Sequence, residues 1–274
     1  MTLPFITIDH DSIAAESFSA VAAARPIPPF SNRYPGIGLD DAYRATARLC
    51  KLHEASGETV VGRKIGFTNR TIWAEYGVYA PIWGFMFAST VRDLAAWDTL
   101  SLAAFAEPRI EPEIVFGLAR SPTPDMDEAA LLGCVDWIAH GFEIVQSVYP
   151  GWKFTAADTV IVNSLHGALL IGTRHRVAEG AAQWLSSLTG FEIDLFRDGL
   201  TVDRGHAANV LDGPLSALRY LVNLLAHDPF NGPLDAGEIV TTGTLTRAFP
   251  IKPSETWSTT PYGIALDGLR VRFS

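Results

Sequence analysis

Two glutamates, one residue apart, interrupt an apolar run near the middle of the chain: Arg109-Ile110-Glu111-Pro112-Glu113-Ile114-Val115-Phe116. If this run is a β-strand, its side chains alternate between two faces, so Glu111 and Glu113 share one face while Ile110 and Ile114 pack on the other. Two carboxylates this close repel each other, and burial would raise their pKa values unless a cation neutralises them. A hard divalent metal bound by oxygen atoms is the simplest such cation. The run therefore predicts a strand that carries part of a metal site.

An exposed strand at the edge of a sheet is the alternative interpretation of this run. Pro112 supports it, because proline has no N–H group to donate to a central ladder of hydrogen bonds. Both glutamates would then face water and need no cation. These residues alone leave the two interpretations open.

A third acid favours the metal. Glu143 lies at the centre of the apolar run 141–145, after a segment from about 127 to 139 that we expect to be helical. Three carboxylates from two strands, completed by water and substrate oxygens, would suit Mg²⁺ or Mn²⁺. Cys50 and Cys134 are isolated in the sequence, and the seven histidines have no paired spacing that would indicate zinc.

The composition is that of an ordinary soluble globular protein. The 274 residues are 48% hydrophobic and 19% charged, which allows a substantial core. The formal net charge of −9, without a basic stripe, argues against nucleic acid as a partner. The first ten residues do not have the pattern of a signal peptide, and no apolar run approaches the roughly 18 residues of a membrane span. Two cysteines provide no disulfide framework, so we expect a cytoplasmic protein.

The first part of the chain has mainly helical patterns. The Ala-rich segment 11–24 predicts one helix, and a second should begin at Asp40 as its N-cap and end at Gly57. We therefore predict an N-terminal mainly helical part at 1–79 and a β-rich, metal-binding catalytic domain at 80–274.

Beyond about residue 80, short apolar or alternating runs predict strands at 110–118, 141–147, 159–162, 167–172, 191–196, 200–203, 238–242 and 268–273. Asp198-Gly199 between two of these runs is typical of a hairpin turn. One amphipathic helix should begin near Asp212, with Pro214 in its first turn. Strands that outnumber helices without a repeated strand–helix–strand unit indicate the α+β fold class.

Several segments, in their order along the chain, resemble one family: Val61-Gly62-Arg63-Lys64-Ile65-Gly66-Phe67-Thr68, the Glu-Pro-Glu run, Phe142-Glu143-Ile144-Val145, Trp152-Lys153 with Asp158-Thr159-Val160, Asn209 with Gly213-Pro214-Leu215, and Gly237-Glu238-Ile239-Val240-Thr241-Thr242-Gly243. This family is the hydratase/decarboxylase branch of the fumarylacetoacetate hydrolase superfamily, typified by 2-keto-4-pentenoate hydratase and 4-oxalocrotonate decarboxylase. The resemblance extends from about residue 25 to the C-terminus. It implies a mixed β-roll core with an N-terminal helical part, a cytoplasmic homo-oligomer, and Mg²⁺ or Mn²⁺ on Glu111, Glu113 and Glu143.

The chemistry that this resemblance implies is that of a metal-dependent lyase in the breakdown of aromatic compounds. The substrate carries a 2-oxo or 2-hydroxy-2-ene acid that chelates the metal, and the metal stabilises the enolate. Our first hypothesis is a hydratase that converts a 2-hydroxy-2,4-dienoate to a 4-hydroxy-2-oxo acid. The alternatives are a decarboxylase of a 2-oxo-enedioate, as in 4-oxalocrotonate decarboxylase, and a hydrolase of the C–C bond of acylpyruvates. A binding protein that has lost catalysis is the non-enzymatic alternative, and the three carboxylates argue against it.

Lys64 stands where the family has an active-site lysine, so it could bind the substrate carboxylate or protonate the enolate. A solvated surface lysine is the alternative. Arg109 could add positive charge near the metal, or it could form an ion pair with Glu107. The set of implied substrate-binding residues is Arg109, Lys153, Asn163 and Ser164.

The chain departs from the family pattern at two positions. Thr155 stands where relatives usually have a second lysine, three residues before the Asp-Thr pair. His166, directly before Gly167, stands where a hydroxyl residue is usual, and we interpret it as a general acid or base. A hydrogen-bonded core histidine is the alternative, in which case Asp158 is the next candidate for the catalytic base.

Overall fold

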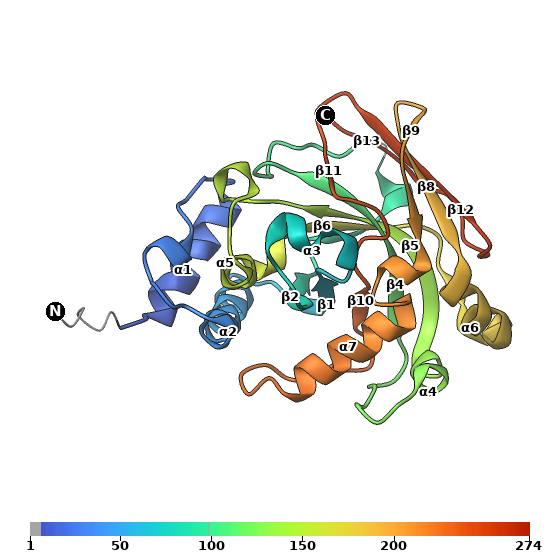
Figure 1. Ribbon diagram of the computed structural model, residues 1–274, viewed down its shortest axis with the longest axis horizontal. Coiled ribbons are helices and arrows are strands. Elements are labelled where there is room, and N and C mark those ends of the chain that lie inside the picture. The colour runs from blue at the N-terminus through green and yellow to red at the C-terminus, as the bar shows by residue number, and fades with distance from the viewer. Residues whose placement is uncertain (1–6, 98) are drawn as a thin grey trace.

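The computed structural model describes residues 7–97 and 99–274, which form two β-sheets with helices packed around them (Figure 1). The helices are α1 (His10–Ala22), α2 (Leu39–Ala55), α3 (Trp73–Tyr76), α4 (Glu128–Leu132), α5 (Ala156–Ile161), α6 (Ala181–Gly190) and α7 (Pro214–Ala226). The strands are β1 (Val60–Gly66), β2 (Ile82–Phe87), β3 (Val91–Asp93), β4 (Arg109–Leu118), β5 (Val135–Val145), β6 (His166–Ile171), β7 (His175–Arg176), β8 (Glu192–Arg197), β9 (Leu200–His206), β10 (Ile239–Thr241), β11 (Phe249–Pro250), β12 (Thr256–Tyr262) and β13 (Arg270–Arg272).

The larger sheet has the strand order β2-β1-β10-β4-β5-β6-β3, with β11 paired to β4 and β7 paired to β5. The smaller sheet has the order β13-β12-β8-β9. In the larger sheet β1 runs parallel to β10 and β3 runs parallel to β6, while its other pairs are antiparallel. Helices and a mixed, curled sheet together confirm the predicted α+β class.

The N-terminal helices form their own cluster at one end of the molecule (Figure 1). α1 and α2 pack against each other and against α5, around buried residues that include Ile13, Phe30 and Val160. β1 and β2, on either side of residue 79, are neighbouring antiparallel strands of the larger sheet. The domain boundary at residue 79 stays a prediction.

Most of the predicted strands coincide with observed ones to within a few residues, and the Asp198-Gly199 turn joins β8 to β9 with positive φ angles at both residues. The helix predicted from 127 to 139 is wrong. Only α4 is helical there, and the chain turns at Gly133 to enter β5 at Val135. The run from Val135 contains β-branched and aromatic residues, Trp137 and Ile138 among them, which favours a strand over a helix.

Two further local predictions are wrong. Residues 159–161 belong to α5, although their β-branched side chains favour a strand. A capping box between Thr155 and Asp158 starts this helix and outweighs that preference. Asp40 is not an N-cap, because α2 begins after Gly38 and Asp40 lies in the first helical turn. Its negative charge there still favours the helix dipole.

β4 is an interior strand, which excludes the exposed-edge interpretation of the Glu-Pro-Glu run. β5 pairs along one side of β4, and β10 and β11 pair along the other. Pro112 falls between the stretches paired with β10 and β11, where its carbonyl accepts a hydrogen bond from the Leu245 N–H at 2.9 Å. No ladder hydrogen bond is therefore lost by the missing N–H of proline.

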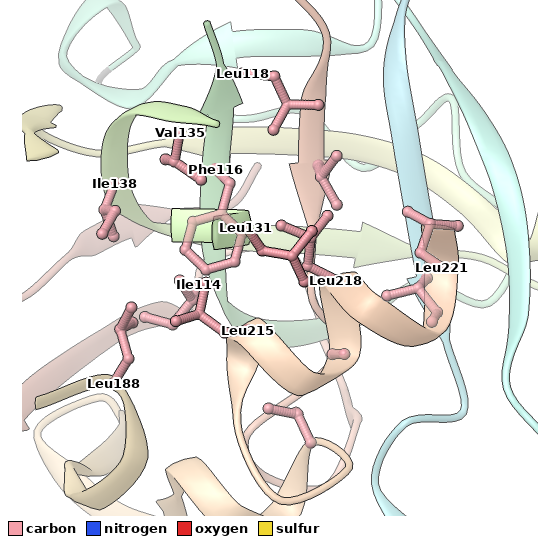
Figure 2. Close-up of a cluster of buried hydrophobic side chains, with 14 of the residues drawn as sticks. Ile114, Phe116, Leu118, Leu131, Val135, Ile138, Leu188, Leu215, Leu218 and Leu221 are labelled. Carbon is pink, nitrogen blue, oxygen red and sulfur yellow. The ribbon is translucent and has the colours of Figure 1, made fainter. Parts of the chain in front are cut away.

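One face of β4 packs into the main hydrophobic core (Figure 2). Ile114, Phe116 and Leu118 on this face lie in the same buried cluster as Leu215, Leu218 and Leu221 of α7. Because side chains alternate along a strand, Glu111 and Glu113 project from the opposite face. The core thus fixes the direction of both carboxylates.

No helix within residues 7–97 and 99–274 has the length and apolar character needed to span a bilayer. The expectation about a signal peptide rests partly on residues 1–6, which lie outside the described residues.

Candidate metal centre and active site

The sheet register brings the three predicted glutamates together. Glu111 on β4 is the direct cross-strand partner of Glu143 on β5, and Glu113 lies opposite Gly141. One carboxylate oxygen from each of the three glutamates lies within 4.8 Å of those of the other two. Two motifs that are separate in the sequence therefore form a single acidic cluster.

Each of the two fully buried glutamates is held through one oxygen. The Gly243 N–H donates to Glu113 Oε2 at 2.7 Å, and His166 Nδ1 lies 2.7 Å from Glu143 Oε1. The second oxygens, Glu113 Oε1 and Glu143 Oε2, accept no hydrogen bond from the described residues. Buried acceptors that lack a protein donor are rare. Their place in one acidic cluster fits an oxygen-bound divalent cation.

Gly243 is required at its position for two reasons. Its φ of +89° lies in the left-handed region, and a Cβ atom there would lie 1.8 Å from Thr68 Oγ1. Thr68 Oγ1 in turn donates to the Thr242 carbonyl at 3.0 Å. Thr68 and Gly243, which end the motifs 61–68 and 237–243, therefore pack closely together. This packing directs the Gly243 N–H toward Glu113.

Burial and mutual repulsion dominate the electrostatics of the cluster. Burial raises the pKa of Glu111 to about 7, against the effect of Lys64. Burial and the neighbouring carboxylates also raise the pKa of Glu113 well above its usual range. Burial acts in the same direction on Glu143, but Lys64 and His166 hold the pKa of Glu143 below its usual value. A metal that binds all three as carboxylates must therefore displace protons at neutral pH.

Lys64 is buried beside the cluster, with 3% of its surface exposed, and is not the solvated lysine of the alternative interpretation. Its Nζ donates to the Ser164 carbonyl at 3.1 Å and lies 3.2 Å from Glu143 Oε2, an ion-pair contact without hydrogen-bond geometry. Burial tends to lower the pKa of the Lys64 ammonium, but the three carboxylates raise it above its usual value. Lys64 therefore carries its positive charge at neutral pH.

A left-handed turn supplies the carbonyl that binds Lys64. Residues 163–165 have φ angles of 57°, 52° and 64°, a conformation that costs about 1–2 kcal/mol per residue. The Asn163 side chain bonds both the N–H and the carbonyl of Phe85, at 2.8 and 2.9 Å, and Ser164 Oγ donates to the Trp83 carbonyl. These contacts with β2 hold the turn in its strained conformation.

Gly84 makes room for this turn. It is the register partner of Lys64 in the β1–β2 pair, and a Cβ atom on it would lie 2.7 Å from the Asn163 carbonyl oxygen. The absence of a side chain lets the turn approach the strand closely enough for the Ser164 carbonyl to reach Lys64.

A cavity opens beside Lys64 and Glu111. Ser164 adds a further polar group to its lining, together with Thr68, Asn69 and Thr244. Apolar side chains make up much of the remaining wall: Phe67, Ile72, Ile82, Val145, Trp152 and Leu165. The cavity thus combines two charged groups, Lys64 and Glu111, with polar and apolar side chains.

Comparisons with known proteins show what the chain is similar to. No protein-family model matches the chain. A 2-hydroxyhexa-2,4-dienoate hydratase of Comamonas testosteroni is 30% identical over 85% of this chain and 86% of its own length. A 4-oxalocrotonate decarboxylase of Pseudomonas sp. strain CF600 is 32% identical over 84% of each chain. A 4-oxalocrotonate decarboxylase structure from Pseudomonas putida G7, complexed with magnesium and adipate, has a TM-score of 0.88 and 25% identity over 98% of this chain and 99% of its own.

The chain belongs to the hydratase/decarboxylase branch of the fumarylacetoacetate hydrolase superfamily. These named relatives are lyases, and this member of the branch is an enzyme of the same broad type.

Two of the substrate-binding residues predicted for this branch lie at or next to the cavity. Ser164 lines it, and Asn163 holds the left-handed turn from within the protein. The Arg109 guanidinium carbon lies 4.1 Å from the ring centre of Trp152, which itself lines the cavity. Lys153 is exposed and borders a separate surface depression with Pro26.

Asp158 is buried at the start of α5 and does not line the cavity. Its two oxygens accept hydrogen bonds from the N–H and hydroxyl groups of both Ser31 and Thr155, at 2.7 to 2.9 Å. These bonds give Asp158 a structural task that joins α5 to the segment around Ser31. Its role as a catalytic base stays a prediction.

His166 lies on the other side of Glu143 from the cavity that Lys64 lines. Its Nε2 is 2.9 Å from Thr90 Oγ1, and both residues line a second cavity together with Phe105 and Gln146. A role for His166 as a general acid or base stays a prediction, since the imidazole contacts Glu143 and does not line the first cavity.

Gly84 lies outside the motifs quoted above, and Gly243 ends one of them without a predicted role of its own. A glycine inside or just after a strand indicates close backbone approach, and that signal is present at both positions. It does not reveal which group approaches, because Asn163 and Thr68 come from distant parts of the chain.

Proposed function

We propose that this enzyme is a divalent-metal-dependent hydratase that converts a 2-hydroxy-2,4-dienoate with a short apolar tail to a 4-hydroxy-2-oxo acid. The cavity lining carries this proposal. Lys64 is the one cationic side chain among the described lining residues, and it already faces Glu143. A second substrate carboxylate in this cavity would lose its hydration without gaining another cation from the described lining residues. A tail without charge fits the apolar side chains of the lining better.

Glu111, Glu113 and Glu143 would hold Mg²⁺ or Mn²⁺. Three carboxylates and one ammonium leave a formal charge of −2, which one divalent cation balances. When bound, such an ion stabilises negative charge on the oxygen next to the substrate carboxylate. The Pseudomonas putida G7 decarboxylase structure is complexed with magnesium, which supports a divalent ion in this enzyme as well.

Lys64 would hold the substrate at its acidic end. Its raised pKa keeps the ammonium charged, which suits a group that binds a carboxylate. Phe67, Ile72 and Trp152 would limit water around the bound dienoate, so that only a bound water reaches the double bond. The sequence offers His166 and Asp158 as proton donor and acceptor for the addition, but neither residue lines this cavity, and both roles stay predictions.

A decarboxylase of a 2-oxo-enedioate is the second candidate. The similarity to two 4-oxalocrotonate decarboxylases favours it. A hydrolase of acylpyruvates is the third possibility. The homo-oligomeric state and the cytoplasmic location also stay predictions.

Product analysis tests the proposed function. The purified protein, loaded with Mg²⁺ or Mn²⁺, is incubated separately with 2-hydroxyhexa-2,4-dienoate, 4-oxalocrotonate and an acylpyruvate. We expect a 4-hydroxy-2-oxo acid from the dienoate at a kcat/KM well above the values for the other two. Faster release of carbon dioxide from 4-oxalocrotonate would instead establish the decarboxylase. Metal binding without any turnover would favour a binding protein.

A further inference from the structure

We propose that His166 is a positioning residue that fixes the orientation of the Glu143 carboxylate from the side opposite the substrate cavity. This inference rests on the proposed metal centre, but not on the choice between hydration and decarboxylation.

The imidazole of His166 is fixed at both of its nitrogens. Nδ1 lies 2.7 Å from Glu143 Oε1, and because an ionised carboxylate only accepts hydrogen bonds, Nδ1–H is the donor. Nε2 lies 2.9 Å from Thr90 Oγ1, and the same hydroxyl donates to the Phe87 carbonyl at 2.9 Å. The His166 side chain is 1% exposed. A ring held in this way has one orientation.

The hydrogen bond from His166 gives the two oxygens of Glu143 different partners. Oε1 is occupied by His166, while Oε2 lies beside Lys64 without a hydrogen bond. Glu113 has the same arrangement, with Oε2 held by the Gly243 N–H and Oε1 left without a partner among the described residues. In each glutamate, one oxygen sets the plane of the carboxylate and the other remains available to a cation.

The position of His166 argues against direct contact with the substrate. A general acid or base must lie within about 3.2 Å of the reacting proton, or one water away. His166 borders the cavity of Thr90 and Gln146, whereas Lys64 and Glu111 border the other. Glu143 lies between His166 and Lys64, since each contacts a different oxygen of its carboxylate.

The left-handed turn couples both partners of Glu143. The Ser164 carbonyl in this turn binds Lys64, and His166 is the first residue of β6 after the turn. One backbone segment, strained and held by Asn163, therefore places the two groups that flank the carboxylate. Outer hydrogen bonds of this kind orient the ligands of metal sites and tune their affinity.

Substitutions of His166 by asparagine and leucine test this role. The Nδ2 of asparagine is three bonds from Cα, as is Nδ1 of histidine, so His166→Asn can still donate to Glu143 but cannot act as an imidazole acid or base. We expect the Kd for Mn²⁺, measured by calorimetry on metal-free protein, to stay within about threefold of the parent. His166→Leu removes the donor and should weaken Mn²⁺ binding by about 10- to 100-fold.

Two further variants distinguish the loss of the His166–Glu143 hydrogen bond from a general effect on folding. His53→Leu makes the same substitution in the lining of the second cavity, at a histidine that stacks on Phe87, and should leave the Kd unchanged. His166→Gln places its amide nitrogen one bond too far from Cα, so it should lose affinity as His166→Leu does. If His166→Leu does not fold, the Kd values of His166→Asn and His166→Gln for Mn²⁺ are compared instead. The electron paramagnetic resonance spectrum of bound Mn²⁺ should change in the glutamine variant and not in the asparagine variant.

Equal loss of affinity in His166→Asn and His166→Gln would overturn the proposal, as would a normal Kd in His166→Leu. A His166→Asn variant with normal Mn²⁺ affinity and abolished turnover would also overturn it, in favour of acid–base catalysis. Failure of the parent protein to bind Mn²⁺ would refute the metal centre itself. Decarboxylation in place of hydration would refute only the proposed reaction, because the affinities of the variants remain interpretable.

Discussion

Glu111 and Glu143 are directly opposed across the β4–β5 pair in the interior of the larger sheet. Like charges in this arrangement destabilise a sheet, and burial adds a desolvation penalty. The folded protein without metal therefore contains a local conflict that protonation or a cation relieves.

Replacement of Glu113 by glutamine should abolish tight metal binding and turnover while it preserves the fold. The amide oxygen can still accept the hydrogen bond from the Gly243 N–H, but the charge that attracts the cation is lost. Calorimetry with Mg²⁺ or Mn²⁺ measures the affinity. Glu179→Gln, at an exposed position, is the control for the change in total charge. Unchanged metal affinity in Glu113→Gln would remove Glu113 from the metal site.

The gain in thermal stability on addition of metal should increase with pH between about 5 and 8. The pKa of Glu111 rises from 4.5 to about 7 on burial, so across this window the folded state without metal binds more protons than the unfolded state. The contribution of Glu111 to the free energy of unfolding of the metal-free protein therefore decreases as the pH rises. The raised pKa of Glu113 acts in the same direction.

Metal binding displaces the protons on Glu111 and Glu113. The stability of the metal-bound protein therefore does not decrease through these two groups as the pH rises. His140 acts in the opposite direction, because burial lowers its pKa to about 4 and the stability from its neutral form is lost as the pH falls below about 6.5. The measurement is the difference in Tm between samples with and without a chelator. The effect of His140 cancels in this difference, because it is the same in the metal-bound and the metal-free protein. An increase in Tm on metal addition that is independent of pH would contradict the prediction.

Substitution of Lys64 should reduce catalysis more than it reduces metal binding. Lys64→Met keeps most of the buried side-chain volume but removes the ammonium that we assign to the substrate carboxylate. We expect kcat/KM to fall by about 10²-fold or more, the range for loss of a positioned proton donor or charge. Steady-state kinetics on metal-saturated protein measure this effect. Normal kinetics together with a lowered Tm would assign Lys64 a structural role.

Gly243→Ala should weaken both the fold and the metal site. The left-handed φ costs a side chain about 1–2 kcal/mol, and the new Cβ would also meet Thr68 Oγ1 at 1.8 Å. Relief of that clash must move the N–H that holds Glu113. Gly57→Ala is the matched control, since Gly57 has a φ of +94° and no atom within 4 Å of a new Cβ. Urea unfolding should show a larger loss for Gly243→Ala, and calorimetry should show weakened metal binding in that variant alone.

Inhibition by unreactive 2-oxo acids should reveal the preference for an uncharged tail. Apart from Lys64, the described lining residues of the cavity offer no cation to a distal carboxylate. We therefore expect 2-oxohexanoate to inhibit at least about tenfold more tightly than 2-oxoadipate, since an unpaired charge in an apolar site costs more than 1.4 kcal/mol. Competitive inhibition constants measure the ratio. Tighter inhibition by 2-oxoadipate would favour the decarboxylase of a dicarboxylic acid.

The amino-acid sequence by itself determined which face of β4 bears acids and indicated the strands β4, β6, β8, β9, β10 and β13, because alternation with a period of two is a local property of the chain. It also indicated α7 and the Asp198-Gly199 turn, whose signals lie within a few residues. It did not indicate β1 or β2. It failed at α5, where the capping box of Thr155 and Asp158 outweighs a β-branched run. The three glutamates could be predicted as a metal site from charge and chemistry, and Lys64 from family resemblance.

Only the tertiary structure decided which groups meet around the carboxylates. The opposition of Glu111 and Glu143 depends on the register of β4 with β5, which periodicity alone does not fix. The ion pair from Lys64 to Glu143 spans the strands between β1 and β5, and it depends on the curl of the sheet. His166 contacts Glu143 because the left-handed turn at residues 163–165 leads directly into β6, whose first residue is His166. These relations arise from contacts between distant segments, and short-range patterns in a sequence carry no information about them.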